Sequence, residues 1–161
     1  MKQWLEKEQM MVDIQIRNKE LVEKYPWLCP ERKDDGAIAD HYDYSYTELD
    51  FLPTGWHDMV LEMCEKLKPM LEEHGLFDTY ALSEIKEKWG TLCWDDYILD
   101  FHCDIPWDVR ALTCDYFDKS KETCMVCGAQ KTAEEFLCEG CKYDREHGLG
   151  RWGKYESLDI T

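Results

Sequence analysis

Four cysteines near the C-terminus carry the clearest chemistry of this 161-residue chain. They form two Cys-x2-Cys pairs separated by ten residues: Cys124, Cys127, Cys138 and Cys141. Zinc prefers four soft or borderline ligands in a tetrahedron, and a Cys-x2-Cys turn places two sulfurs along one edge of it. Gly128 and Gly140 ease the backbone turns that point amides at thiolates. We therefore predict one Zn²⁺ on these four thiolates, in a closed site that is structural rather than catalytic.

The remaining five of the nine cysteines are spread along the chain and are predicted to be free thiols of a reducing compartment. A second metal site would draw on Cys93, His102, Cys103 and Cys114. His102 and Cys103 would point to opposite faces of a predicted strand, which disfavours their convergence on one ion.

Compact groups of histidine, cysteine and acid occur at His57-Asp58 and at His102-Cys103-Asp104. Neither has a second motif at a distance that would complete a catalytic pair. The sequence contains no phosphate-binding glycine loop, His-Glu-x-x-His helix or nucleophile elbow. We therefore predict a protein without enzymatic activity. A metal-dependent enzyme of unknown reaction is an alternative that ranks below the two binding functions described next.

The formal net charge is −16, from 35 acids and 19 bases. Seven bases and six acids lie between Lys119 and Lys154, so the negative charge belongs to the rest of the chain. Such an acidic body repels phosphate backbones and attracts basic surfaces. The charge distribution predicts a protein partner with a basic surface.

An acidic, tyrosine-rich stretch before the second helix is the candidate interface, because aromatic anchors supply contact area and carboxylates supply charge complementarity. The candidate partner-binding residues are Asp34, Asp35, Tyr42, Asp43, Tyr44, Tyr46, Glu48 and Asp50. The equally favoured alternative is a solvated acidic loop whose tyrosines are tucked inward.

Direct nucleic-acid binding is the second alternative, since zinc lobes often use a basic stripe with interleaved aromatics. Its candidate residues are Lys142, Arg145, Arg151, Trp152 and Lys154. Phosphate is opposed by the acidic body and by acids of the same lobe, among them Glu134, Glu135, Glu139 and Asp144, so this function ranks below protein binding.

The elements that must position these residues indicate an α+β fold, in which helices pack on a small antiparallel sheet and a treble-clef-like or ribbon-like zinc lobe follows. Apolar periodicity predicts helices over residues 2–24, 55–74 and 106–121. Alternation predicts strands over 84–89, 91–94 and 98–103, with a turn at Asp95-Asp96. We expect Pro69 to kink or loosen the second helix.

The first helix carries apolar residues at helical spacing, and we expect them to form a core face. These residues are Leu5, Met11, Val12, Ile16, Leu21, Val22 and Tyr25. A docking face for another protein is the alternative.

We divide the chain into an acidic body, residues 1–118, and a zinc lobe with its tail, residues 119–161, that fold as one unit. The charged N-terminus and the lack of a long apolar run predict a cytoplasmic protein without a membrane span.

Several short strings in the chain form a recognisable series: Tyr25-Pro26, Gly55-Trp56, Lys86-Glu-Lys-Trp89-Gly90-Thr-Leu92, and Ser120 followed by Cys124-x2-Cys127-Gly128. This series resembles a family of uncharacterised small proteins of bacteriophages and prophages. The resemblance covers roughly residues 20–145. This chain has Trp89 and Cys93 where the family pattern has Phe and a basic residue. The resemblance implies a phage or prophage origin and carries no activity.

Origin and charge together predict a non-enzymatic protein that binds a host protein in the bacterial cytoplasm. Surface carboxylates would compete with phosphates for the same Lys and Arg groups. Inhibition of a defence nuclease or a CRISPR-type effector by nucleic-acid mimicry fits this pattern.

Overall fold

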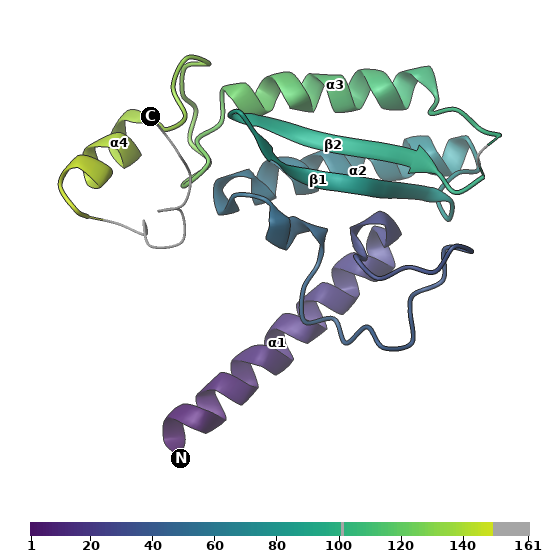
Figure 1. The fold of residues 1–161 in the computed structure, drawn as a ribbon, viewed down its shortest axis with the longest axis horizontal. Helices are drawn as coiled ribbons and strands as arrows, with labels where there is room; N and C mark the ends of the chain where they lie inside the picture. Colours follow the sequence, from purple (N-terminus) through teal and green to yellow (C-terminus); the bar gives the residue numbers. More distant parts are fainter. Residues whose placement is uncertain (101, 150–161) are drawn as a thin grey trace.

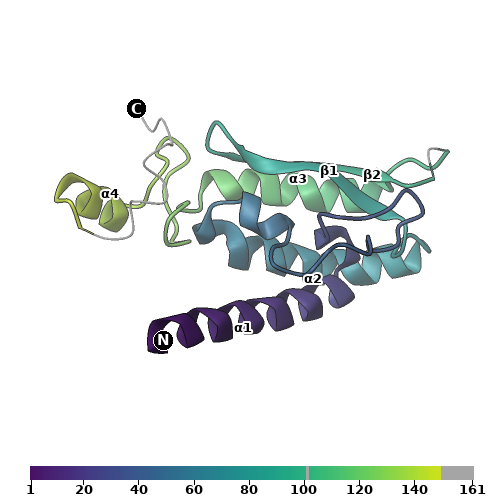
Figure 2. The same ribbon diagram turned by 60° about the horizontal axis from the view of Figure 1, so that its bottom comes forward.

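The computed structural model describes residues 1–100 and 102–149 and confirms the predicted α+β class (Figure 1). Its α-helices are α1 (Lys2–Lys24), α2 (His57–Glu73), α3 (Trp107–Lys121) and α4 (Glu139–Glu146). The strands are β1 (Tyr80–Lys88) and β2 (Thr91–Ile98), and short 3-10 helices are η1 (Pro26–Leu28), η2 (Glu48–Phe51) and η3 (Thr54–Trp56). Helices α2 and α3 cover one face of the β1–β2 hairpin (Figures 1 and 2).

The core forms between this hairpin and the two helices. Among its fully buried side chains are Trp27, Trp56, Met63, Leu67 and Tyr80. The apolar stripe of α2 is buried as predicted, and the helix continues through Pro69 to Glu73. The tight packing of large aromatic and aliphatic groups supplies most of the burial energy, at about 1.5–3 kcal/mol per large side chain.

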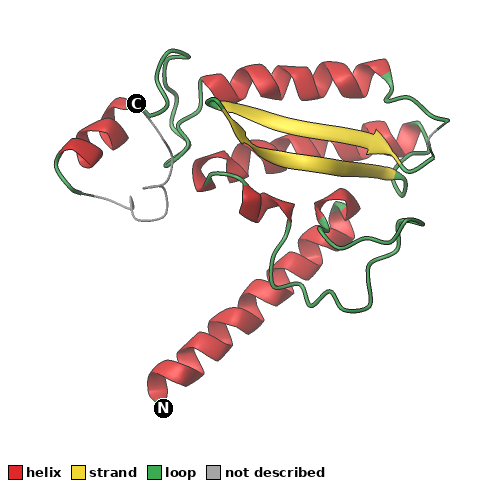
Figure 3. Cartoon of the chain, viewed as in Figure 1, coloured by secondary structure: helices red, strands yellow, loops and turns green. Residues whose placement is uncertain are grey.

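The sheet is a single antiparallel hairpin, whose tip is the Trp89-Gly90 turn (Figure 3). Both tip residues have positive φ, 55° and 78°, as expected of a two-residue hairpin turn. Glycine adopts this conformation readily, whereas it is uncommon for a residue with a bulky side chain such as Trp89. The side chain of Trp89 is 86% exposed. The break between the strands predicted over 84–89 and 91–94 is therefore confirmed.

The predicted turn at Asp95-Asp96 is wrong, because both residues pair with β1 inside the continuous strand β2. The Tyr80 hydroxyl donates to the Asp96 carboxylate over 2.6 Å, which gives this half-buried acid a partner within the sheet. The predicted strand 98–103 is also wrong. Beyond Ile98, the described residues up to Cys103 form bends and a turn.

The prediction that the apolar residues of helix α1 form a continuous core face is wrong for its first turns. Val22 and Tyr25 are buried, but Leu5, Met11, Val12 and Ile16 are exposed. Only the last turns contact the body, where the Asn18 amide donates to the carbonyl of Tyr44 over 2.8 Å. The first turns extend away from the body, and their apolar side chains are not covered by the residues that the structure describes (Figures 1 and 2).

Over residues 1–100 and 102–149, none of the helices combines the length and the apolar character that a membrane crossing requires.

Candidate metal centre

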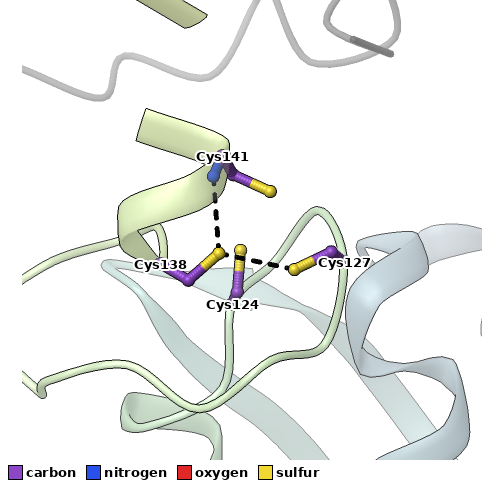
Figure 4. A group of neighbouring side chains, drawn as sticks. All are labelled: Cys124, Cys127, Cys138 and Cys141. Carbon is purple, nitrogen blue, oxygen red and sulfur yellow. Dashed lines mark hydrogen bonds between the residues drawn. The ribbon is translucent and has the colours of Figure 1, made fainter. Parts of the chain in front are cut away.

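The four predicted ligands meet in the lobe that follows α3 (Figure 4). Cys124 and Cys127 lie on a tight knuckle, closed by the bridge between Thr123 and Gln130. Cys138 caps α4 and Cys141 lies in its first turn. A knuckle followed by a helix that supplies the second pair matches the treble-clef-like form of the prediction.

The geometry of the four sulfurs suits one metal ion. All four ligand atoms lie within 4.8 Å of one another, and the sulfurs of Cys127 and Cys138 are 3.5 Å apart. Tetrahedral Zn–S bonds of about 2.3 Å place sulfurs roughly 3.8 Å apart, whereas a disulfide requires about 2.05 Å. The cluster is thus spaced for a metal and not for a disulfide.

Backbone amides point at the sulfurs. The amide of Ala129 donates to Cys127 Sγ over 3.4 Å, and that of Cys141 donates to Cys138 Sγ over 3.5 Å. Gly128, at φ +80°, allows its own amide to reach the carbonyl of Cys124 over 2.9 Å. The amides of Ala129 and Cys141 stabilise negative charge on sulfur, which a thiolate ligand needs, and the Gly128 bond closes the turn.

The surroundings of the cluster shift the pKa values of its thiols in different directions. Burial opposes ionisation of Cys124, but the amides of Cys127, Cys138 and Val126 outweigh it and lower the pKa of Cys124 to about 7. Burial raises the pKa of Cys127 and of Cys141. The raised pKa values mean that Cys127 and Cys141 resist ionisation near neutral pH. A bound cation would supply the opposite charge that four thiolates require.

A joint fastens the lobe to the body through Gly55-Trp56. The Gly55 amide donates to the carbonyl of Met125 over 2.9 Å, and the Trp56 indole donates to that of Thr123 over 3.0 Å. Gly55 lies so close to the backbone of residues 124–125 that a Cβ would overlap the Cys124 carbonyl oxygen. The Gly-Trp string is thus a docking surface for the knuckle.

Two more strings of the phage-like pattern meet the same lobe. Gly90 packs against the ring of Phe136, which a Cβ would approach within 2.6 Å. The hydroxyl oxygen of Ser120 accepts a hydrogen bond of 2.9 Å from the backbone amide of Leu92, and the hydroxyl donates one to the carbonyl of Phe117. None of these contacts of Gly90 and Ser120 was predicted from the sequence. The short strings that contain them were the only indication in the sequence that these positions matter.

The structure does not assemble the second metal site. Within the described part of the chain, the four lobe cysteines are the only group of three or more His, Cys, Asp or Glu side chains placed to hold an ion. Cys103 and Cys114 are exposed, Cys93 is half-buried, and the sulfur of Cys103 lies 3.8 Å from the Asp100 carboxylate.

The candidate partner-binding residues divide by type. Asp34, Asp35, Asp43 and Asp50 are exposed, and Glu48 is half-buried. The tyrosines face inward: Tyr42 is 7% exposed, and its ring lies 4.7 Å from that of Tyr44. The hydroxyl of Tyr46 donates to Glu31 over 2.7 Å. The stretch therefore adopts the alternative form, in which carboxylates face solvent and the tyrosines pack.

The basic residues of the nucleic-acid alternative are partly engaged. Lys142 lies 3.6 Å from the carboxylate of Glu135, and Arg145 also has an interaction partner. Arg151, Trp152 and Lys154 lie outside the described residues.

No protein-family model matches the chain, no curated protein matches it, and no solved structure matches its fold. The resemblance to phage and prophage proteins therefore stays a prediction.

Proposed function

We propose that the four cysteines hold one Zn²⁺ and that this ion stabilises the fold. Four sulfur donors within 4.8 Å of one another favour zinc among the abundant divalent ions. With four protein ligands, no position is left for a substrate or a water. Zinc supplies on the order of 10 kcal/mol of folding free energy in small metal-dependent domains, enough to order a lobe of this size.

We further propose that the acidic body binds the basic surface of a host protein, as a phage- or prophage-derived, non-enzymatic inhibitor. The observation that carries this proposal is the charge imbalance, with 35 acids against 19 bases. Within residues 1–100 and 102–149, ion pairs occupy only a minority of the acids, so much of the charge is available to a partner.

One end of the body concentrates such carboxylates. The loop of Asp34 and Asp35 folds against the open end of the hairpin, where Arg32 donates to the carbonyl of Asp78 over 2.8 Å. Asp78 precedes β1 and Asp100 follows β2, and all four acids are exposed. We name this group of four residues the acidic end.

Nucleic-acid mimicry is the proposed mechanism. A Lys or Arg that normally contacts phosphate oxygens accepts carboxylate oxygens in similar geometry. The inward packing of the tyrosines leaves charge, rather than aromatic insertion, as the main means of recognition. A defence nuclease or a CRISPR-type effector, with its positively charged channel, is the class of host protein that fits.

Affinity capture from bacterial lysate tests the proposal. The full chain should retain proteins with basic, nucleic-acid-binding surfaces, and raising the salt concentration should release them. The double variant Asp34→Lys, Asp35→Lys should weaken capture at least about tenfold, since charges that steer association act locally. The control Glu6→Lys, Glu20→Lys makes the same change of net charge on exposed positions of α1 and should bind like the wild type.

If both double variants lost capture equally, the net charge of the chain rather than the acidic end would determine binding. That result would refute the assignment of the acidic end as the binding surface. Salt-independent binding to neutral or acidic proteins would refute mimicry. Retention of nucleic acid that is lost on Lys142→Glu would instead support the nucleic-acid alternative.

A further inference from the structure

Helix α1 presents an apolar stripe on the side that the body does not use. Leu5, Val12 and Ile16 are 57%, 45% and 55% exposed. At about 100° per residue these three share one face, more than about 100° around the helix from the buried Asn18. The stripe and the face that contacts the body are therefore separate surfaces of one helix.

The first turns of α1 need a partner to explain their composition. A helical segment that packs on nothing is marginal in water when it is shorter than about 12–15 residues. Trp4 and Met11 are also exposed, but they lie about 100° around the helix from Leu5 and Val12, on the side of the buried Val22, so they form a second apolar surface. Surfaces of this kind mark interaction sites in soluble proteins.

We propose that the stripe binds the same stripe of a second copy, with the two α1 helices antiparallel. The positions Leu5, Gln9, Val12 and Ile16 follow the 4-3-4 spacing of a helix-pairing seam. A two-fold axis between residues 10 and 11 places Leu5 opposite Ile16 of the second copy. The same axis places Gln9 opposite Val12, so the surface is complementary to itself.

Charge favours this partner and this direction. Helix α1 has five acids and five bases, whereas the whole chain has a net charge of −16. A neutral helix is the part of the molecule that two like-charged copies can bring together at least electrostatic cost. The antiparallel arrangement leaves the acidic bodies at opposite ends of the pair. Their separation then exceeds the screening length of about 8 Å at physiological salt.

The available length sets the expected strength of the pairing. Residues 2–16 span about 22 Å of helix. Two such segments side by side, paired through Leu5, Gln9, Val12 and Ile16 alone, form a small interface of the kind found in weak or transient complexes. The expected complex is therefore a weak dimer whose population depends on protein concentration.

Sedimentation or light scattering of the full chain over a concentration series tests the pairing. The wild type is expected to approach about 38 kDa, twice the 19.2 kDa chain mass. Val12→Glu should weaken association at least about 100-fold, because it buries an unpaired carboxylate in the seam. Met10→Glu is the matched control, since Met10 is 59% exposed on the other side of the helix and should remain dimeric.

A mixing experiment tests the direction. Leu5→Lys and Ile16→Glu should each be monomeric alone and should form a heterodimer together, because an antiparallel pair sets Lys opposite Glu. Parallel helices would give no such recovery. A wild type that stays at 19 kDa, equal loss in Met10→Glu, or absence of recovery on mixing would overturn the proposal. Both substituted residues are exposed in the single chain, so its thermal unfolding checks that the variants fold.

Discussion

Cys138 combines two tasks, because its sulfur belongs to the metal cluster and also caps α4. Cys138→Ser separates them, since serine is itself a good N-cap but a poor zinc ligand. Loss of outer-sphere partners alone costs about 10- to 100-fold in metal affinity, so loss of a ligand should cost at least about 100-fold. Competition with a chromogenic chelator measures this.

Cys114→Ser is the control for this substitution, because Cys114 is exposed on α3 and belongs to no cluster among the described residues. It should retain one zinc per chain. Equal affinity in Cys138→Ser and the wild type would show that the metal centre is not formed as proposed.

Glu48 is a half-buried acid whose charge opposes folding. Burial, together with the negative charge of Glu31, raises the pKa of Glu48 to about 7 from its ordinary value of 4.5. A raised acid pKa adds stability that is complete below about pH 4.5 and is lost as the pH rises through about 7. The protein should therefore lose stability across this window.

Glu48→Gln should remove that pH dependence. After allowance for solvent screening, the variant should be more stable than the wild type by about 1–2 kcal/mol at pH 8 and equal to it near pH 4.5. Urea unfolding at the two pH values measures the difference, with the exposed Glu65→Gln as control. A constant offset at both pH values would contradict the assignment to ionisation.

The joint between η3 and the knuckle depends on close backbone approach at Gly55. Gly55→Ala should destabilise the protein by about 1–3 kcal/mol, because its Cβ meets rigid backbone atoms of Cys124 and Met125. Gly140 lies in α4 with open space around its ideal Cβ. Gly140→Ala should therefore be neutral or stabilising by up to about 1 kcal/mol. Thermal unfolding compares the two, and equal effects would mean that the joint contributes nothing.

The helices and the cysteine cluster were predictable, because 3.6-residue periodicity, Pro26 and the Cys-x2-Cys spacing are local signals. The strands were misdivided, because two adjacent aspartates favour a turn in isolation. The hydrogen bond from Tyr80 that accommodates Asp96 in β2 joins residues sixteen positions apart. Periodicity also identified the stripe of α1 without showing what covers it. The contact of Trp56 with Thr123 spans 67 positions, which no local pattern encodes.

Considered as a whole, the molecule has a large core under the hairpin and a small separate cluster around Cys124, Leu137 and Cys141. Metal removal should therefore open the lobe first. Amides of residues 123–149 should lose protection in hydrogen exchange, while those of α2 and the hairpin keep theirs. Loss of the joint should lower the unfolding temperature of the body by about 5 °C. Simultaneous exchange across the whole chain would contradict this order.

With zinc bound as proposed, the joint would also make the metal supply a determinant of how long the protein survives in a cell. Coupling between two sites is reciprocal, so contacts from Gly55 and Trp56 that hold the knuckle also tighten its grip on the ion. A peptide of the lobe alone would therefore bind zinc more weakly than the full chain. In a metal-starved cell the open lobe would become a substrate for proteases, and the abundance of the protein would follow the metal.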